Sequence, residues 1–259
     1  MKIAAAQLTC VPADVPANVA RATALAVRAR EEGAGLLVLP ELVLTGYELR
    51  AVAEDPSLWV TPEDPRLDPL RSSGIATVVN CAAPGPGGRP VIASLVFGPA
   101  GVLLTTYAKQ HLYEQERDHF SAGDRDGRFE LGGLRFCLAT CFDNHVPELA
   151  ARGAADGCRV HLASSLYGTG NGVRERAALH PALARDHGLY VALANHVGPA
   201  GPWTGCGGAA VWAPDGTLLA EADDRAPGLA VAEVPGAVAE VPGPVAEAPV
   251  TGPGAVAGR

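Results

Sequence analysis

The sequence predicts a layered α/β fold with large sheets, and two observations lead to this prediction. Short apolar segments alternate with amphipathic helical segments through about the first 225 residues, giving at least ten strands and four or five helices. Such mixing is typical of helices packed on sheets. No change of composition divides this part of the 259-residue chain, so we expect one domain with a sizeable core.

The elements of the first half follow from apolar runs and from the residues that interrupt them. Lys2–Leu8 predicts an opening strand. Asp14 and Pro16 then predict the start of a helix, which Gly33 ends. A buried strand is expected over residues 36–39. Turns rich in proline and glycine separate three more expected strands, at residues 75–82, 91–97 and 102–107.

The second half continues the alternation. Its expected strands are residues 129–131, 134–140, 159–163, 189–194, 209–212 and 217–220. Gly132 and Gly133 join the first two of these as a hairpin. Pro147 suits the first turn of a helix, and another helix is expected from about Val173.

The end of the chain has a different composition. Val-Ala-Glu recurs every seven residues between 231 and 247, but the intervening prolines and glycines would break any helix. We therefore expect the folded domain to span residues 1–234. Residues 235–259 are predicted to form a low-complexity, flexible tail.

Composition and charge argue against several function classes. A nucleic-acid binder needs a basic face, and a net charge of −8, from 20 basic and 28 acidic residues, does not suggest one. No apolar run approaches the roughly 20 residues of a membrane helix, and the apolar start of the chain is too short for a signal peptide. Six cysteines without a CxxC pair indicate free thiols rather than a zinc site. We therefore expect a cytoplasmic protein that binds neither nucleic acid nor a membrane.

Several common motifs for catalysis and nucleotide binding are absent from the sequence. It contains no GxSxG elbow, no phosphate-binding GxxxxGK[ST] loop and no HExxH pair. The glycine-rich residues 168–172 lack the last glycine of GxGxxG and are interpreted as a loop. His111 and His119 are likewise interpreted as loop contacts, so no metal is expected.

Three polar residues stand out because each lies at or near the end of a predicted strand, where sites form in α/β sheets. Burial of Glu41 would raise its pKa and suit a general acid or base, the alternative being a glutamate at a helix start. Lys109 is one of only two lysines and either faces an oxyanion or is an ordinary surface lysine. Cys141 precedes the helix at Pro147, whose N-terminus would stabilise a thiolate, the alternative being a buried structural cysteine.

Together these segments resemble the nitrilase, or carbon–nitrogen hydrolase, superfamily. Residues 39–47 (LPELVLTGY) resemble its glutamate motif, residues 107–113 (YAKQHLY) its lysine motif and residues 141–148 (CFDNHVPE) its cysteine motif. The order of the three motifs also matches. With further similarities between and after them, the resemblance spans about residues 1–234.

The resemblance implies a four-layer α-β-β-α sandwich and a defined chemistry. Cys141 would attack an amide carbonyl while Glu41 takes the thiol proton. Lys109 and the backbone N–H of Phe142 would hold the oxyanion. Glu41 would return the proton to the leaving amine and then activate the water that hydrolyses the thioester. Glu116 would be a supporting fourth catalytic member that orients Lys109 or the substrate, and no metal or organic cofactor would be needed.

Some positions depart from the family pattern. Many members have arginine and phenylalanine where His145 and Val146 stand, and nitrile-cleaving members often have Trp-Glu in place of Phe142 and Asp143. Amide or carbamoyl substrates are therefore expected rather than nitriles. The residues expected to bind substrate, with core packing as the alternative for each, are Phe142, Tyr47, Tyr113, His145, Tyr167 and Trp203.

The leading hypothesis is an amidase that converts a small linear amide into a carboxylic acid and ammonia or an amine. One alternative is an N-carbamoyl amine or amino-acid hydrolase, which would also release carbon dioxide, and another is acyl transfer to an amine. A third is a non-catalytic binding protein on the same fold. We expect a small-molecule substrate and a homodimer or higher homo-oligomer.

Overall fold

The computed structural model describes residues 1–236, and its elements follow the expected order. The strands are β1 (Lys2–Leu8), β2 (Ala34–Val38), β3 (Ala76–Pro84), β4 (Pro90–Phe97), β5 (Leu103–Ala108), β6 (Arg128–Leu131), β7 (Leu134–Thr140), β8 (Val160–Ser164), β9 (Tyr190–Ala200), β10 (Trp203–Cys206), β11 (Ala210–Trp212), β12 (Leu218–Glu221) and β13 (Gly228–Glu233). The α-helices are α1 (Val15–Glu31), α2 (Leu49–Glu54), α3 (Asp68–Arg71), α4 (Glu116–His119), α5 (Pro147–Ala155) and α6 (Asn171–His187). Except for its first two residues, the predicted tail at 235–259 lies outside the described residues.

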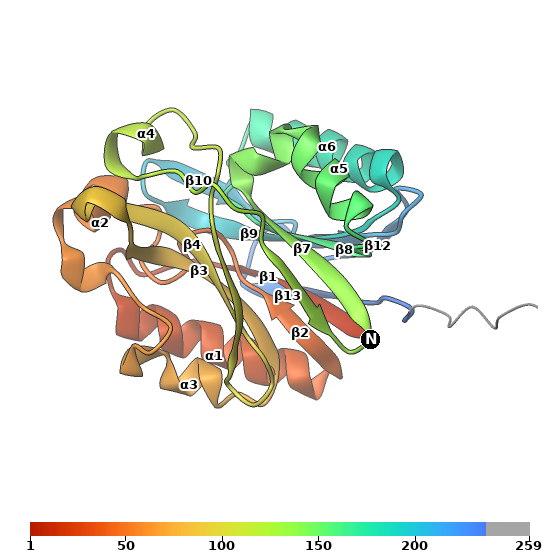
Figure 1. Cartoon of the computed structure of the whole chain (residues 1–259), viewed down its shortest axis with the longest axis horizontal. Coiled ribbons are helices and arrows are strands. Elements are labelled where there is room, and N and C mark those ends of the chain that lie inside the picture. Colours follow the sequence, from red (N-terminus) through yellow and green to blue (C-terminus); the bar gives the residue numbers. More distant parts are fainter. Residues whose placement is uncertain (237–259) are drawn as a thin grey trace, which may run out of the picture.

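Two sheets pack face to face, and helices cover their outer faces (Figure 1). One sheet has the strand order β5-β4-β3-β2-β1-β13 and the other β6-β7-β8-β9-β11-β12. The parallel strands β1 and β9 pair at Gln7–Asn195 and Leu8–His196 and so link the two sheets. Helices α1 and α3 lie outside the first sheet, and α5 and α6 lie outside the second. The expected four-layer α-β-β-α sandwich is thereby confirmed.

The central strands are buried on both faces, which explains their continuous apolar sequence. Along β2, Leu36 and Val38 pack in the core between the two sheets, whereas Leu37 packs in the core beneath α1. Along β9, Ala192 belongs to the same central core and Leu193 to the core beneath α5 and α6. The alternation has the period of two that a strand imposes.

The first helix begins and ends where its sequence predicts. The side chain of Asp14 accepts a hydrogen bond from the backbone N–H of Ala17 at 3.0 Å, which caps the helix start. Gly33, just past the end of α1, has a φ of +81°, a conformation that glycine adopts without strain. Val19 and Ala26 lie on the buried face of the helix against the first sheet.

Two strands were not expected from the sequence, and a third is longer than expected. Gly198 and Pro199 are typical of a turn, yet β9 continues through them and pairs with β10 as a two-stranded ribbon. Such a ribbon tolerates proline because it has free edges. The strand β13 pairs antiparallel with β1, from Lys2–Glu233 to Gln7–Gly228. Its alanine-rich sequence carries only a weak strand signal, so its place depends on the partner strand.

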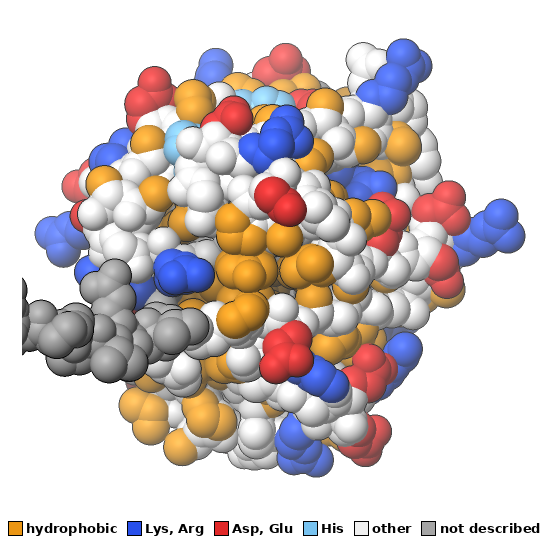
Figure 2. Space-filling model, turned by 90° about the vertical axis from the view of Figure 1, so that its right-hand side faces the viewer, with side chains coloured by type: hydrophobic (Ala, Val, Ile, Leu, Met, Phe, Trp, Pro, Cys, Tyr) orange, Lys and Arg blue, Asp and Glu red, His pale blue; other side chains and the backbone are white. Residues whose placement is uncertain are grey.

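The surface carries charges of both signs. On the face of the described residues drawn in Figure 2, lysine and arginine side chains are interspersed with aspartate and glutamate and form no continuous basic area. Hydrophobic side chains gather near the centre of that face. In residues 1–236 no helix combines the length and the apolar character that a membrane span requires.

Candidate active site

The three polar residues singled out at strand ends come together in space. Strands β2, β5 and β7 run in the same direction, so their carboxyl ends meet at one end of the sandwich. Glu41 follows β2, Lys109 follows β5 directly and Cys141 follows β7 directly. Lys109 Nζ lies 2.8 Å from Glu41 Oε1 and 2.7 Å from the carboxylate of Glu116, at the start of α4. Lys109 is therefore a buried cation between two carboxylates and not a surface lysine.

Glu41 lies in a turn rather than at the start of a helix. Residues 41–45 form no helix, and Leu42 has a φ of +46°, which costs energy for a residue with a side chain. The buried Asn80 on β3 holds this turn by accepting a hydrogen bond from Leu42 N–H at 2.8 Å. The side-chain amide of Asn80 donates to Ser94 Oγ at 3.0 Å and to Thr140 Oγ1 at 3.1 Å. Asn80 thus joins the Glu41 turn to the residue that precedes Cys141.

We predict that Asn80→Ala lowers the free energy of unfolding by about 2–3 kcal/mol, because it leaves several buried polar groups without partners. It should also lower kcat by roughly tenfold or more, since Glu41 and Cys141 lose their common support. Ser94→Ala is the matched control, because it removes one of these partners and leaves the two turns joined. Urea unfolding and steady-state kinetics test this prediction. Equal effects of the two variants would contradict it.

Cys141 also has a left-handed backbone, with a φ of +47°, and opens a short 3-10 helix, Cys141–His145. The buried carboxylate of Asp143 holds this turn. It accepts hydrogen bonds from the backbone N–H of Thr140 at 3.0 Å, the backbone N–H of His111 at 2.8 Å and the hydroxyl of Tyr107 at 2.6 Å. The imidazole of His111 lies 3.0 Å from the same carboxylate, so His111 is a loop contact as expected.

A second chain of contacts reaches the backbone of the cysteine itself. The side-chain amide of Asn144 donates to the carbonyl of Cys141 at 2.8 Å. Asn144 Oδ1 in turn lies 2.8 Å from Nε2 of the buried His161. These contacts fix the strained turn from beneath, which is how a backbone outlier is maintained. In residues 1–236 no group of three histidine, cysteine, aspartate or glutamate side chains is arranged to hold a metal ion.

The electrostatics assign a proton acceptor to this cluster. Burial raises the pKa of Glu41 to about 7, although the charge of Lys109 acts in the opposite direction. Burial alone would lower the pKa of Lys109, but the charges of Glu41, Cys141 and Glu116 outweigh it and raise this pKa. Glu41 Oε2 is buried and accepts no hydrogen bond from residues 1–236. Glu41 therefore accepts a hydrogen bond from Lys109 with one oxygen and has the other oxygen free to accept a proton.

The pKa of Cys141 differs from the expectation of a stabilised thiolate. Burial raises this pKa well above its ordinary value, and the negative charges of Glu41 and Glu116 raise it further. Lys109 acts in the opposite direction without reversing the shift. The resting group is consequently a thiol, whose proton must leave when the sulfur reacts.

Glu116 is held by its own set of donors. The Tyr47 hydroxyl donates to Glu116 Oε1 at 2.6 Å, and the backbone N–H of Tyr113 donates to Oε2 at 2.7 Å. Burial, with the charges of Glu41 and Glu116, raises the pKa of Tyr47, so its hydroxyl keeps its proton and remains a donor. With both of its oxygens occupied, Glu116 positions Lys109 and has no free oxygen to act as a base.

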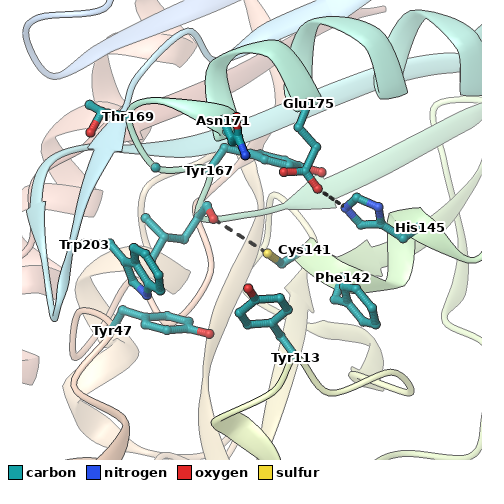
Figure 3. A pocket seen from close by; sticks show the side chains of 13 residues that line it. Tyr47, Tyr113, Cys141, Phe142, His145, Tyr167, Thr169, Asn171, Glu175 and Trp203 are labelled. Carbon is teal, nitrogen blue, oxygen red and sulfur yellow. Dashed lines mark hydrogen bonds and ion pairs between the residues drawn. The ribbon is translucent and has the colours of Figure 1, made fainter.

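Cys141 faces a cavity of about 420 Å³. All six of the expected substrate-binding residues line it, together with Leu166, Thr169, Asn171 and Glu175 (Figure 3). The Cys141 Sγ lies 3.8 Å from the carbonyl oxygen of Leu166. Sequence reasoning missed Glu175, which reads as an ordinary exposed helix residue. The only signal for it was its place just after the glycine-rich loop at 168–172.

Comparisons with known proteins agree with this geometry. Residues 2–242 match the model of the carbon–nitrogen hydrolase family. The chain is 32% identical to an (R)-stereoselective amidase of a Pseudomonas species, over 76% of this chain and 72% of that protein. It is 31% identical to the hydrolase in the pqqF 5′ region of Pseudomonas protegens, over 85% of this chain and 78% of that protein.

Solved structures of an amidase are also similar to this chain. The amidase from Nesterenkonia sp. AN1 superposes with a TM-score of 0.82 at 33% identity, covering 91% of this chain and 93% of that chain. In mutants of that amidase, acrylamide or the acetamide moiety of fluoroacetamide is attached to the active-site cysteine. Another mutant of it is in complex with butyramide.

Proposed function

The chain belongs to the carbon–nitrogen hydrolase family and is an enzyme of that class, and we propose that it hydrolyses small linear primary amides through a thioester on Cys141. One observation carries the proposal. Beside the Cys141 thiol lies a buried carboxylate, Glu41, with a free oxygen and a pKa of about 7, held in place by Lys109. A base of this pKa is suited to removing a thiol proton near neutral pH.

The first half of the reaction forms the thioester. Cys141 Sγ attacks the amide carbonyl carbon as its proton passes to Glu41, which gives a tetrahedral oxyanion. Lys109 and the backbone N–H of Phe142 are the groups that we assign to this oxyanion. Glu41 then returns the proton to the nitrogen, the C–N bond breaks and ammonia departs. Cys141 remains acylated as a thioester.

The second half returns the enzyme to its starting state. Glu41 accepts a proton from a water molecule that attacks the thioester carbonyl, and the same two groups hold the second oxyanion. The C–S bond breaks, the proton returns to the sulfur and the carboxylic acid leaves. One amide and one water thus give one acid and one ammonia, with Glu41 acting twice as base and twice as acid.

The cavity supports a small substrate. Its volume of about 420 Å³ lies near the lower end of ligand sites, which run from roughly 300 to 1,000 Å³. Aromatic side chains such as Tyr47, Tyr113 and Phe142 line it and suit a short acyl chain. The Nesterenkonia amidase, whose structures include butyramide, is similar to this chain across nearly its whole length.

Product analysis tests the proposal. Purified protein is incubated with primary amides of increasing chain length, and ammonia and carboxylic acid are quantified together. The expected result is equal amounts of the two products from at least one short amide. N-carbamoyl amines, assayed in parallel, would release carbon dioxide with the ammonia. Activity on these compounds alone, with none on any amide, would reject the amidase proposal in favour of carbamoyl hydrolysis.

The pH profile supplies a second test. Glu41 acts as a base only when ionised, so kcat/KM should fall about tenfold for each pH unit below its pKa of about 7. Because the pKa values of both Cys141 and Lys109 are raised, neither group ends the plateau at moderately alkaline pH. Steady-state kinetics in buffers of constant ionic strength measure the profile. A limb near the ordinary glutamate pKa, with full activity at pH values well below 7, would contradict the role of Glu41.

A further inference from the structure

We propose that the acyl chain of the preferred substrate carries a protonated amine, which Glu175 recognises inside the pocket. This inference rests on the amidase function proposed above and names the substrate class of the same site. Three features lead to it: the charge of the lining residues, the free oxygen of Glu175 and the aromatic walls.

The ionic character of the pocket is one-sided. Its lining residues, all from the described part of the chain, include the carboxylate of Glu175 but no lysine or arginine. The cation beneath the pocket, Lys109, already has Glu41 and Glu116 as partners at 2.8 Å and 2.7 Å. A substrate carboxylate would therefore find no unpaired lysine or arginine among the described lining residues and would be repelled by Glu175.

Glu175 is fixed in position but not fully paired. Its Oε1 lies 2.9 Å from His145 Nε2, and in residues 1–236 no ion pair or hydrogen bond uses its Oε2. The two side chains are 44% and 29% exposed, for Glu175 and His145 respectively, and both line the pocket, so a ligand there can reach them. Figure 3 shows them together on one side of the pocket, with Trp203 and Tyr47 on the other.

The walls next to this carboxylate are aromatic. The Phe142 ring lies 5.6 Å from the Tyr113 ring and 5.3 Å from the His145 ring, centre to centre. Faces of aromatic rings attract cations, so the walls and Glu175 favour the same charge. An ammonium group would gain an ion pair and ring contacts, whereas a methyl group of similar size would gain only burial. The ligand chemistry that fits is a primary amide with an amine on its acyl chain.

Matched substrates test the inference. The pairs are glycinamide with propanamide, 3-aminopropanamide with butanamide, and 4-aminobutanamide with pentanamide, with succinamate as the anionic case. We expect at least one amino amide to exceed its neutral partner by about fivefold to tenfold in kcat/KM, from an exposed ion pair together with contacts to aromatic ring faces. Succinamate should be the poorest substrate. All assays are run at a pH at which the amines are protonated.

Variants of Glu175 identify the source of the preference. Glu175→Gln should reduce the ratio of amino to neutral amide to near one, and Glu175→Lys should turn the preference toward succinamate. Glu148→Gln is the matched control, because Glu148 is an exposed carboxylate on α5 outside the pocket lining and its loss changes net charge equally. This control should keep the wild-type ratio.

The outcomes separate the two proposals. Hydrolysis of neutral amides without any preference for their amino partners would overturn the inference and leave the amidase function standing. A preference that survives in Glu175→Gln, or that Glu148→Gln removes equally, would also overturn it. Failure to release ammonia from any of the amides would reject the proposed function itself, and the inference with it.

Discussion

Cys141→Ala is expected to abolish amide hydrolysis, with kcat reduced on the order of 10⁴-fold or more, while the protein stays folded. Without the sulfur no thioester forms, and the remaining groups cannot supply a covalent route. The substitution removes one partly exposed atom at the cavity and leaves the contacts of Asp143 and Asn144 in place. Ammonia release measures the activity, and thermal unfolding checks the fold.

Cys158→Ala is the control for this variant. Cys158 is also a free cysteine, but it is buried in the core beneath α5 and α6 and does not line the cavity. We expect it to retain wild-type kcat with a modest loss of stability, as for other buried truncations. A Cys141→Ala protein that kept a tenth of the wild-type activity would contradict the assignment of the nucleophile.

Lys109→Met should have the second largest effect. It leaves the carboxylates of Glu41 and Glu116 buried and without their shared cation. Breaking a buried ion pair in this way costs about 3–5 kcal/mol of stability. Without the lysine the pKa of Glu41 rises further, so the base is protonated at neutral pH, and the oxyanion loses a positive charge. We expect kcat to fall by about 10³-fold.

The loss of stability in Lys109→Met should depend on pH. A carboxyl group whose folded-state pKa is raised is tolerated when protonated and destabilises the fold once it is ionised. The free energy of unfolding of this variant should therefore fall furthest below that of the wild type above pH 7, and the difference should shrink as the pH falls. Urea unfolding on both sides of pH 7 measures it. Lys2→Met is the control, because Lys2 is the only other lysine and is exposed. Equal stability and activity of the two variants would contradict the role of Lys109 as the shared partner of Glu41 and Glu116.

Local patterns in the sequence predict the strand ends that carry Glu41, Lys109 and Cys141, since apolar runs and turn residues mark where each strand stops. Glu116 has no such signal and follows only from the family resemblance. Asn80 is visible as a polar residue within an apolar strand, which predicts that it has partners but not which ones. The edge strand β13 is defined by its pairing with β1, more than 200 residues away along the chain.

The protonation state of Cys141 shows why local reasoning fell short. The sequence places a helix start after the cysteine, which favours a thiolate. In the structure the helix α5 begins at Pro147 as predicted, but a short 3-10 turn separates it from the cysteine. Burial of the sulfur raises its pKa, and two carboxylates from distant segments, Glu41 and Glu116, raise it further. Their approach depends on how β2, β5 and β7 align, which no local pattern encodes.

Limited alkylation by iodoacetamide across pH tests whether Glu41 activates the thiol of Cys141. Peptide mass spectrometry follows all six cysteines in the wild-type protein and in Glu41→Gln. We expect preferential labelling of Cys141 that rises as Glu41 ionises near pH 7, below the roughly 8.5 pKa of a free thiol, and that is lost in Glu41→Gln. Labelling of Cys141 no faster than that of Cys10 or Cys206, or unchanged in Glu41→Gln, would contradict it.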